Sequence, residues 1–161
     1  NKDRFPDIVI AEFLGESILF VSVGGQSFRR VDQEVGMRRW RPEHHVTLTA
    51  WIDYDNDGFP DLLLGNSIDH KEEGKRFRDV TRTSNIQLNN NPMGAAVADY
   101  DVDGDLDFYL VYQNPNTETS PGDGKPKPWV GDEESGAVNQ LWRNNGDGTF
   151  TEVAAQAGLD N

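Results

Sequence analysis

The feature that most constrains this chain is a nine-residue acidic segment, DYDNDGFPD (53–61), that leads directly into the apolar run LLLG. Nearly the same segment returns as DYDVDGDLD (99–107), followed by FYLVY. Such crowding of charge beside an apolar segment is unfavourable, because two like charges about 4 Å apart repel by roughly 1–4 kcal/mol, depending on the dielectric. A pattern that occurs twice with the same spacing therefore needs a structural cause.

Both loops have the spacing of a cation site. Counted from the first aspartate, carboxylates occupy positions 1, 3, 5 and 9, and glycine holds position 6, where a sharp turn is needed. The alternate carboxylates can converge on one point, while the carbonyl at position 7 can face inward. Hard oxygen ligands in this number suit Ca²⁺ better than Zn²⁺ or Mg²⁺. The predicted ligands are Asp53, Asp55, Asp57, Phe59 and Asp61 in one loop, and Asp99, Asp101, Asp103, Asp105 and Asp107 in the other.

Two other interpretations of the loops are weaker. A solvated acidic turn with splayed side chains explains one loop, but not the duplicated spacing and glycine. An EF-hand needs a bidentate Glu at position 12 and flanking helices. Position 12 is Leu64 or Leu110 here, within an apolar run, so position 9 closes the loop instead.

The N-terminus fits as a third, truncated copy of the loop. Aligning Asp7 with position 9 puts Asp3 at position 5 and Asn1 at position 3, and the apolar run IVI follows. Arg4 then replaces the turn glycine. Since the chain starts in the middle of a motif, we expect it to be a fragment or a processed product. The candidate third metal site comprises Asn1, Asp3, Phe5 and Asp7.

Three further segments share one pattern: SFRRVDQEVGM (27–37), RFRDVTRTSNI (76–86) and TFTEVAAQAGL (149–159). Each places Phe, then Val three residues on, then Gly or Asn followed by an aliphatic residue. The pattern predicts three repeat units, roughly 1–45, 46–92 and 93–161. The third unit is longer because of an insertion within 113–137, rich in Pro, Gly and polar residues, which indicates a long surface loop.

Each unit is expected to consist mainly of strands. Residues 18–31 and 141–153 predict hairpins, and the acidic loops join the strand-like segments that flank them. The second unit fits least well, because SIDHKEEGK offers no clear strand before Phe77. An antiparallel unit of about 50 residues is the size of a propeller blade. The sequence therefore predicts an all-β fold, a β-propeller segment of about three blades.

The charge pattern excludes several classes of function. The net charge is −13, and 11 of the 28 acids lie in residues 1–7, 53–61 and 99–107. Nucleic acid is an unsuitable partner because phosphate binding needs basic stripes, and no apolar run reaches the roughly 18 residues that span a bilayer. There is no cysteine and no nucleophile–base motif. A carboxylate occupied by calcium is a poor acid or base, so we expect no enzymatic activity.

The loops and the repeat together resemble FG-GAP/VCBS-type repeats, the calcium-loop blades also found in integrin α-subunit propellers. The segments WIDYDNDGFPDLLLGN, AVADYDVDGDLDFYLV and LWRNNGDGTFTEVAAQAGL are most similar to the cartilage-acidic-protein (ASPIC-associated) branch and its bacterial relatives. The resemblance implies a β-propeller, usually of seven blades, with calcium in the loops and roles in adhesion, ligand display or extracellular scaffolding. Closed propellers have four to eight blades, so the remaining blades or protein partners are expected to cover the open edges.

The sequence thus favours a calcium-stabilised scaffold or adhesion module that acts through protein contacts. The alternatives are a carbohydrate-binding, lectin-like propeller and an accessory propeller of a larger secreted enzyme. Trp129 in the insertion and Trp40 beside a basic run are candidate partner or glycan contacts. Weak calcium sites fill only where calcium is abundant, so we expect an extracellular, cell-surface or periplasmic location.

Overall fold

The computed structural model describes residues 3–11, 17–37, 48–65, 67–72, 76–88, 92–112 and 138–159, with the backbone alone for 67–72. The predicted insertion at 113–137 lies outside these residues. No helix among the described residues is long and apolar enough to cross a membrane.

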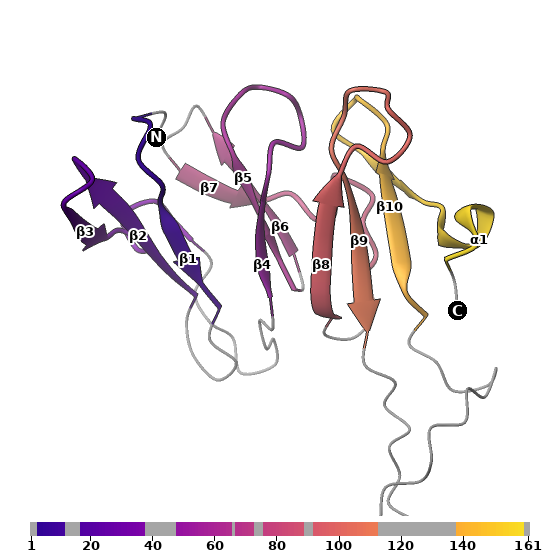
Figure 1. Cartoon of the computed structure of the whole chain (residues 1–161), viewed down its shortest axis with the longest axis horizontal. Coiled ribbons are helices and arrows are strands. Elements are labelled where there is room, and N and C mark those ends of the chain that lie inside the picture. The colour runs from indigo at the N-terminus through magenta and orange to yellow at the C-terminus, as the bar shows by residue number, and fades with distance from the viewer. Residues whose placement is uncertain are drawn as a thin grey trace, which may run out of the picture.

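The described chain forms three antiparallel sheets, which stand side by side in a row from β3 at one end to α1 at the other (Figure 1). The first sheet contains β1 (Ile8–Ile10), β2 (Ile18–Val23) and β3 (Ser27–Arg30). The second contains β4 (Thr49–Ile52), β5 (Asp61–Leu64), β6 (Ser67–Glu72) and β7 (Arg76–Asp79). The third contains β8 (Pro92–Ala98), β9 (Asp107–Tyr112), β10 (Gln140–Asn144) and β11 (Phe150–Glu152), and α1 (Ala154–Ala157) follows it.

The predicted β-rich, antiparallel architecture is confirmed, and so are both predicted hairpins, β2–β3 and β10–β11. The prediction for the polar segment before Phe77 was wrong, because it forms β6, paired with β5 on one side and β7 on the other. Strand formation depends strongly on pairing context, so two neighbouring strands hold a segment whose own composition is unfavourable. The three described sheets do not close into a ring, so the predicted propeller and the bounds of its three repeat units stay predictions.

A tight turn of the same form follows the last strand of each sheet. In each turn, the N–H of the residue four positions after a valine donates to the carbonyl of that valine. The distances are 3.1 Å from Val35 to Val31, 2.9 Å from Ser84 to Val80 and 2.9 Å from Ala157 to Val153. The backbone then becomes left-handed, with φ of 73° at Gly36, 59° at Asn85 and 72° at Gly158. Glycine and asparagine tolerate this conformation best. The Gly-or-Asn position of the sequence pattern therefore marks this turn.

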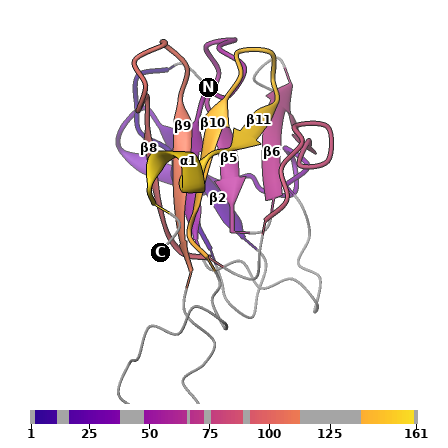
Figure 2. The ribbon, with the colours of Figure 1, turned by 90° about the vertical axis from the view of Figure 1, so that its right-hand side faces the viewer.

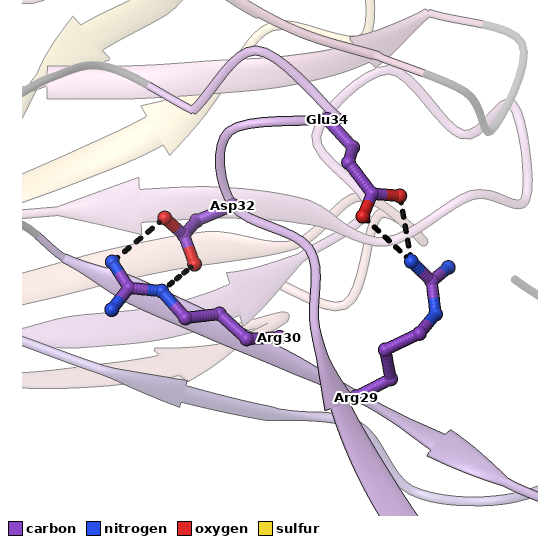
Figure 3. Close-up of polar contacts among 4 residues, drawn as sticks. All are labelled: Arg29, Arg30, Asp32 and Glu34. Carbon is purple, nitrogen blue, oxygen red and sulfur yellow. Dashed lines mark hydrogen bonds and ion pairs between the residues drawn. The ribbon is translucent and has the colours of Figure 1, made fainter.

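Two ion pairs hold the first of these turns (Figure 3). Arg30 binds Asp32 through Nε and Nη2, at 2.7 Å and 3.0 Å, and Nη1 of Arg29 lies 2.7 Å from both carboxylate oxygens of Glu34. The Arg30 side chain beside it lowers the pKa of the buried Asp32 carboxyl. The third turn has no such pairs among its described residues, and its residues form α1, which the sequence analysis did not predict.

Most of the hydrophobic core lies between the sheets, and a smaller cluster of Leu141, Val153 and Ala154 lies within the third sheet and α1. One cluster joins the first and second sheets and includes Leu19, Val31, Leu62 and Phe77. The other joins the second and third sheets and is built around Ile52, Leu63, Phe108 and Phe150, with the Phe108 and Phe150 rings meeting edge to face. Each sheet therefore depends on its neighbour for burial.

Matching hydrogen bonds also join neighbouring sheets. The N–H of Phe77 in β7 donates to the carbonyl of Val35 in the first turn, at 2.7 Å. The N–H of Phe150 in β11 donates in the same way to the carbonyl of Ser84 in the second turn, at 2.9 Å. From here on, a unit means one observed sheet together with the turn that follows it, rather than one of the predicted repeat units. The first and second units thus meet as the second and third units do.

Candidate metal centre

The two acidic loops lie at the same edge of the row of sheets (Figure 1). The 53–61 loop joins β4 to β5, and the 99–107 loop joins β8 to β9. In each case the last aspartate of the loop is the first residue of the next strand, Asp61 in β5 and Asp107 in β9. The sheet therefore fixes one end of each loop.

Three carboxylates converge in each loop, those at positions 1, 3 and 9. One oxygen from each lies within 4.8 Å of the others. Such convergence of negatively charged oxygens is unfavourable unless protons or a cation compensate it. Each loop can therefore hold a metal ion. The two groups are Asp53, Asp55 and Asp61, and Asp99, Asp101 and Asp107.

The carboxylate at position 9 is buried and serves the backbone as an acceptor. Asp61 Oδ2 accepts the N–H of Tyr54 at 3.2 Å, and Asp107 Oδ2 accepts the N–H of Tyr100 at 3.0 Å. Asp107 Oδ1 also accepts the N–H of Asn144 in β10, at 2.8 Å. These bonds orient the position-9 carboxylate toward its own loop, so the side chain both closes the loop and contributes to the convergent group.

The carboxylate at position 1 differs between the loops. In both, Oδ2 accepts the N–H of the turn glycine at 3.0 Å. Oδ1 of Asp99 accepts a second N–H, from Asp103, at 3.1 Å. Oδ1 of Asp53 is buried and has no hydrogen-bond partner. A buried carboxylate oxygen without a donor is strongly disfavoured, so this atom fits a bound cation.

Burial raises the pKa of the Asp53 carboxyl, and the charges of Asp57 and Asp55 raise it further against the effect of the Gly58 N–H. Burial also raises the pKa of Asp107, against the lowering by its bonds from the Tyr100 and Asn144 N–H groups. Both shifts show that the charged form of the carboxylate is destabilised in the protein without a cation.

The carboxylates at position 5 lie outside the convergent groups. Oδ1 of Asp57 accepts the N–H of Phe59 at 2.7 Å, and Oδ1 of Asp103 accepts the N–H of Asp105 at 2.9 Å. These bonds shape the turn through position 7. The predicted ligand roles of the two position-5 aspartates, and of the position-7 carbonyls of Phe59 and Asp105, stay predictions.

Positive φ angles occur at two positions of each loop. The turn glycines have φ of 78° (Gly58) and 101° (Gly104), as expected for position 6. Position 4 is left-handed as well, with φ of 57° at Asn56 and 64° at Val102. Asparagine accepts this conformation readily, whereas a β-branched residue is strained by it. Val102 therefore carries local strain that Asn56 does not.

The loops are also joined to each other, through Asn56 and Asn144, neither of which was among the predicted site residues. The side-chain amide of Asn56 donates to Oδ1 of Asp105 in the other loop. Asn144, which is fully buried, donates through Nδ2 to the carbonyl of Tyr54 at 2.7 Å and to that of Leu106 at 3.3 Å. In the sequence, Asn144 stands only as part of the predicted hairpin at 141–153, and no local pattern indicates this role. The two candidate sites therefore share one hydrogen-bonded framework.

The N-terminal segment has the backbone geometry of the same loop. Oδ1 of Asp3 accepts the N–H of Phe5 at 3.0 Å, as the position-5 aspartates do. Arg4 has a φ of 67°, so it takes the left-handed conformation of the glycine that it replaces. Oδ1 of Asp7 accepts the N–H of Ser22 in β2 at 2.9 Å, matching the bond from Asn144 to Asp107. Asn1 lies outside the described residues, so metal binding at this third site stays a prediction.

The predicted contact residues Trp40 and Trp129 also lie outside the described residues, and the glycan interpretation stays a prediction. The chain matches no known protein-family model, and no curated protein is significantly similar to it. The function must therefore be argued from the loops and the sheets themselves.

Proposed function

We propose that this chain is a calcium-stabilised segment of a β-propeller that serves as an extracellular scaffold or adhesion module. The buried Oδ1 of Asp53 carries the proposal, because it has no donor and lies in a convergent group of carboxylates. A hard divalent cation would supply the missing positive partner. Ca²⁺ suits the site best, because it accepts many oxygen ligands in flexible geometry, whereas Mg²⁺ demands a near-ideal octahedron.

The arrangement of the sheets supports the propeller interpretation. The second and third sheets are antiparallel and four-stranded, as propeller blades are. Neighbouring units meet through the same hydrogen bond and an apolar layer. The acidic loops of the second and third units lie at the same edge, which is what a radial repeat of one blade would produce. The resemblance of these loops to FG-GAP/VCBS-type repeats agrees with this proposal.

The calcium would act mechanically in this scaffold. It would tie each acidic loop to the first residue of the strand that follows it, β5 or β9. It would also relieve the repulsion among the aspartates. With calcium near ~1 mM and a Kd on the order of 0.1 mM, one site adds about 1.4 kcal/mol by mass action. Cytosolic calcium is far too dilute for this effect, so we place the protein outside the cytosol.

Thermal unfolding in 2 mM calcium and in excess EGTA, with calorimetric titration of the ion, tests the proposal. We expect two ions to bind, one at each convergent group. Together they would add about 3 kcal/mol, which raises Tm by roughly 5–10 °C for a chain of this size. Magnesium at the same concentration is the ion control and should give a much smaller shift.

The paired variant Asp55→Asn/Asp101→Asn is the matched protein control. Both residues belong to the convergent groups, and both side chains are exposed, so the substitutions should leave the metal-free fold intact. We expect the variant to lose most of the calcium-dependent rise in Tm. If the wild-type protein binds no calcium and its Tm is unchanged, the aspartates are solvated and the proposal is wrong.

A further inference from the structure

Asn144 is the last residue of β10, and it binds both acidic loops from outside either of them. It is fully buried, and its backbone lies beside Asp107, the last aspartate of the 99–107 loop. Figure 2 views the row of sheets from the third sheet and shows the end of β10 at the edge where the two loops lie. One residue of the third unit therefore contacts the acidic loop of the second unit as well as its own.

Every polar atom of the Asn144 side chain has a defined partner. Nδ2 donates to the carbonyls of Tyr54 and Leu106, at 2.7 Å and 3.3 Å. Oδ1 accepts the N–H of Gly146 at 3.1 Å. Two donated bonds and one accepted bond in this arrangement require an amide, because a carboxylate has no donor and a hydroxyl has only one hydrogen. The position therefore needs asparagine, and another polar residue would not serve.

The bond to Tyr54 fixes the backbone between two candidate metal ligands. Tyr54 stands between Asp53 and Asp55, so its carbonyl belongs to the peptide group that leads to Asp55. The N–H of Tyr54 donates to Oδ2 of Asp61 at 3.2 Å. The three residues of this convergent group are thus all bonded to Tyr54, two covalently and one by a hydrogen bond.

Asn144 holds the 99–107 loop mainly through its backbone. Its N–H donates to Oδ1 of Asp107 at 2.8 Å, and this bond does not need the side chain. The side chain adds only the longer bond to the carbonyl of Leu106. Removal of the amide should therefore affect the 53–61 loop more than the loop of its own unit.

The residue at this strand position differs in the other two units. Asn144 pairs with Phe150, and the residues that pair with the two corresponding phenylalanines are Ser22 and Lys71. Neither of these carries an amide. The N–H of Ser22 still donates to Oδ1 of Asp7, so the strand and its bond to the loop aspartate form without asparagine. The amide of Asn144 therefore has a role beyond forming the strand.

We propose that Asn144 is a positioning residue for calcium in the 53–61 loop, so that the affinity of this site depends on the third unit. The inference rests on the proposed function, because it concerns one of the two proposed calcium sites. Residues that orient metal ligands without touching the ion typically change the affinity by about 10–100-fold when they are replaced. A single bond to the backbone beside the ligands corresponds to the lower end of this range.

Calorimetric titration of calcium into proteins with one intact site tests the proposal. Asp101→Asn leaves the 53–61 site intact, and Asp55→Asn leaves the 99–107 site intact. Asn144→Ser is added to each of them, because serine occupies the equivalent position in β2 and the backbone N–H is kept. We expect the Kd of the 53–61 site to rise about tenfold, and that of the 99–107 site to rise less than about threefold.

Gln140→Ser is the matched control, because Gln140 is a second buried amide of β10. Its Nε2 donates at 3.1 Å to the carbonyl of Gln87, just after the second turn. It pairs with Leu110, at the end of β10 away from the loops. Both serine variants should be less stable in EGTA, so the titrations are made at a temperature where circular dichroism shows each protein folded. The control should leave both Kd values unchanged, which a purely structural role of Asn144 would not distinguish from its own variant.

Nuclear magnetic resonance of the Asn144 side-chain amide gives a test that does not depend on the folding of a variant at this position. In Asp101→Asn protein, calcium has only the 53–61 site intact. We expect the Asn144 amide resonances to shift in step with the occupancy of this site, while those of the Gln140 amide stay in place.

Three results would overturn the proposal: Asn144 resonances that ignore calcium, an unchanged Kd of the 53–61 site in Asn144→Ser, or an equal rise of that Kd in Gln140→Ser. Calcium binding by the wild-type protein would still support the proposed function in each of these cases. A wild-type protein that binds no calcium would contradict the proposed function and this inference together.

Discussion

The two acidic loops share one sequence pattern, yet they differ in how far their carboxylates are satisfied without a cation. Both oxygens of Asp99 accept N–H groups, whereas Oδ1 of Asp53 is buried with no donor. The N–H of Asp57, which corresponds to the one that Asp99 binds from Asp103, instead donates to Asp55 at 3.3 Å. This one bond distinguishes the two position-1 carboxylates, while both loops keep a convergent group of three carboxylates.

Backbone strain at position 4 differs between the two loops in the opposite sense, because it is greater in the 99–107 loop. Position 4 is left-handed in both, but the 53–61 loop places asparagine there and the 99–107 loop places valine. Asn56 also donates to Asp105, while Val102 is almost fully solvent-exposed. At position 4 the 53–61 loop is therefore the less strained of the two, whereas its position-1 carboxylate has the fewer hydrogen bonds. We therefore expect the two loops to differ in how strongly their stability depends on a cation.

The largest expected effect comes from Asp107→Ala. This substitution removes the acceptor of the Tyr100 and Asn144 N–H groups, and a buried donor left unsatisfied costs about 1–3 kcal/mol. We expect the free energy of unfolding to fall by about 2–4 kcal/mol in EGTA, because the protein itself depends on these bonds. Urea unfolding followed by circular dichroism measures it.

Asp101→Asn is the control for this prediction, since Asp101 is exposed and belongs to the same convergent group. It should change the unfolding free energy in EGTA by less than about 0.5 kcal/mol. If Asp107→Ala destabilises the protein only when calcium is present, the 99–107 loop depends on its ion after all, and the contrast between the loops disappears.

The next effect compares Asp53→Asn with Asp99→Asn in EGTA. Asparagine at 53 keeps an acceptor for Gly58 and removes the unpartnered buried charge, so we expect a gain of about 0.5–1 kcal/mol in the free energy of unfolding. Asparagine at 99 has one acceptor for two N–H groups, so we expect a loss of about 1 kcal/mol. Urea unfolding should therefore give opposite signs for the same change of residue.

Calcium should change the result for both variants. Each substitution removes one carboxylate ligand, so each variant should lose about 1.4 kcal/mol of calcium-dependent stabilisation relative to the wild-type protein. If both variants instead lose the same free energy of unfolding in EGTA, Oδ1 of Asp53 accepts a hydrogen bond in solution and the predicted contrast is wrong.

The smallest effect is expected from Val102→Asn, which gives the 99–107 loop the position-4 residue of its partner. A β-branched residue in the left-handed region is strained by roughly 1–2 kcal/mol, and asparagine relieves part of this. We expect stability to rise by about 0.5–1 kcal/mol in calcium and in EGTA alike. Asn56→Val, the reciprocal exchange, should lower it. A loss of stability from Val102→Asn would mean that the valine makes a contact that outweighs the strain.

Much of the architecture could be predicted from the sequence because local patterns determine it. The aspartate spacing marked the loops, and the strand-like segments within 18–31 and 141–153 marked the hairpins. The Gly-or-Asn position marked the repeat, and the structure shows that it is the left-handed residue of each turn. Each of these signals reflects a backbone preference within a few residues of the chain, which is why sequence reasoning finds them.

The remainder depends on contacts between residues that are distant in the sequence. β6 is a strand because β5 and β7 lie on either side of it, which its polar composition does not indicate. The position-5 aspartates accept a nearby N–H instead of joining the convergent group, which their spacing alone does not indicate. The bridging role of Asn144 follows only from its place between two sheets.

The bond from Asn144 to the carbonyl of Tyr54 spans 90 residues of sequence and has a consequence for synthesis. At about 5–20 residues per second, residue 144 emerges roughly 5–20 s after residue 54. During that interval the carbonyl of Tyr54 lacks the Asn144 side chain as its donor, although the 99–107 loop emerges before the interval ends. The second unit, although made earlier, therefore reaches its native state only when the third unit folds. The time for which the nascent loop is open to proteases and chaperones is set by the rate of translation.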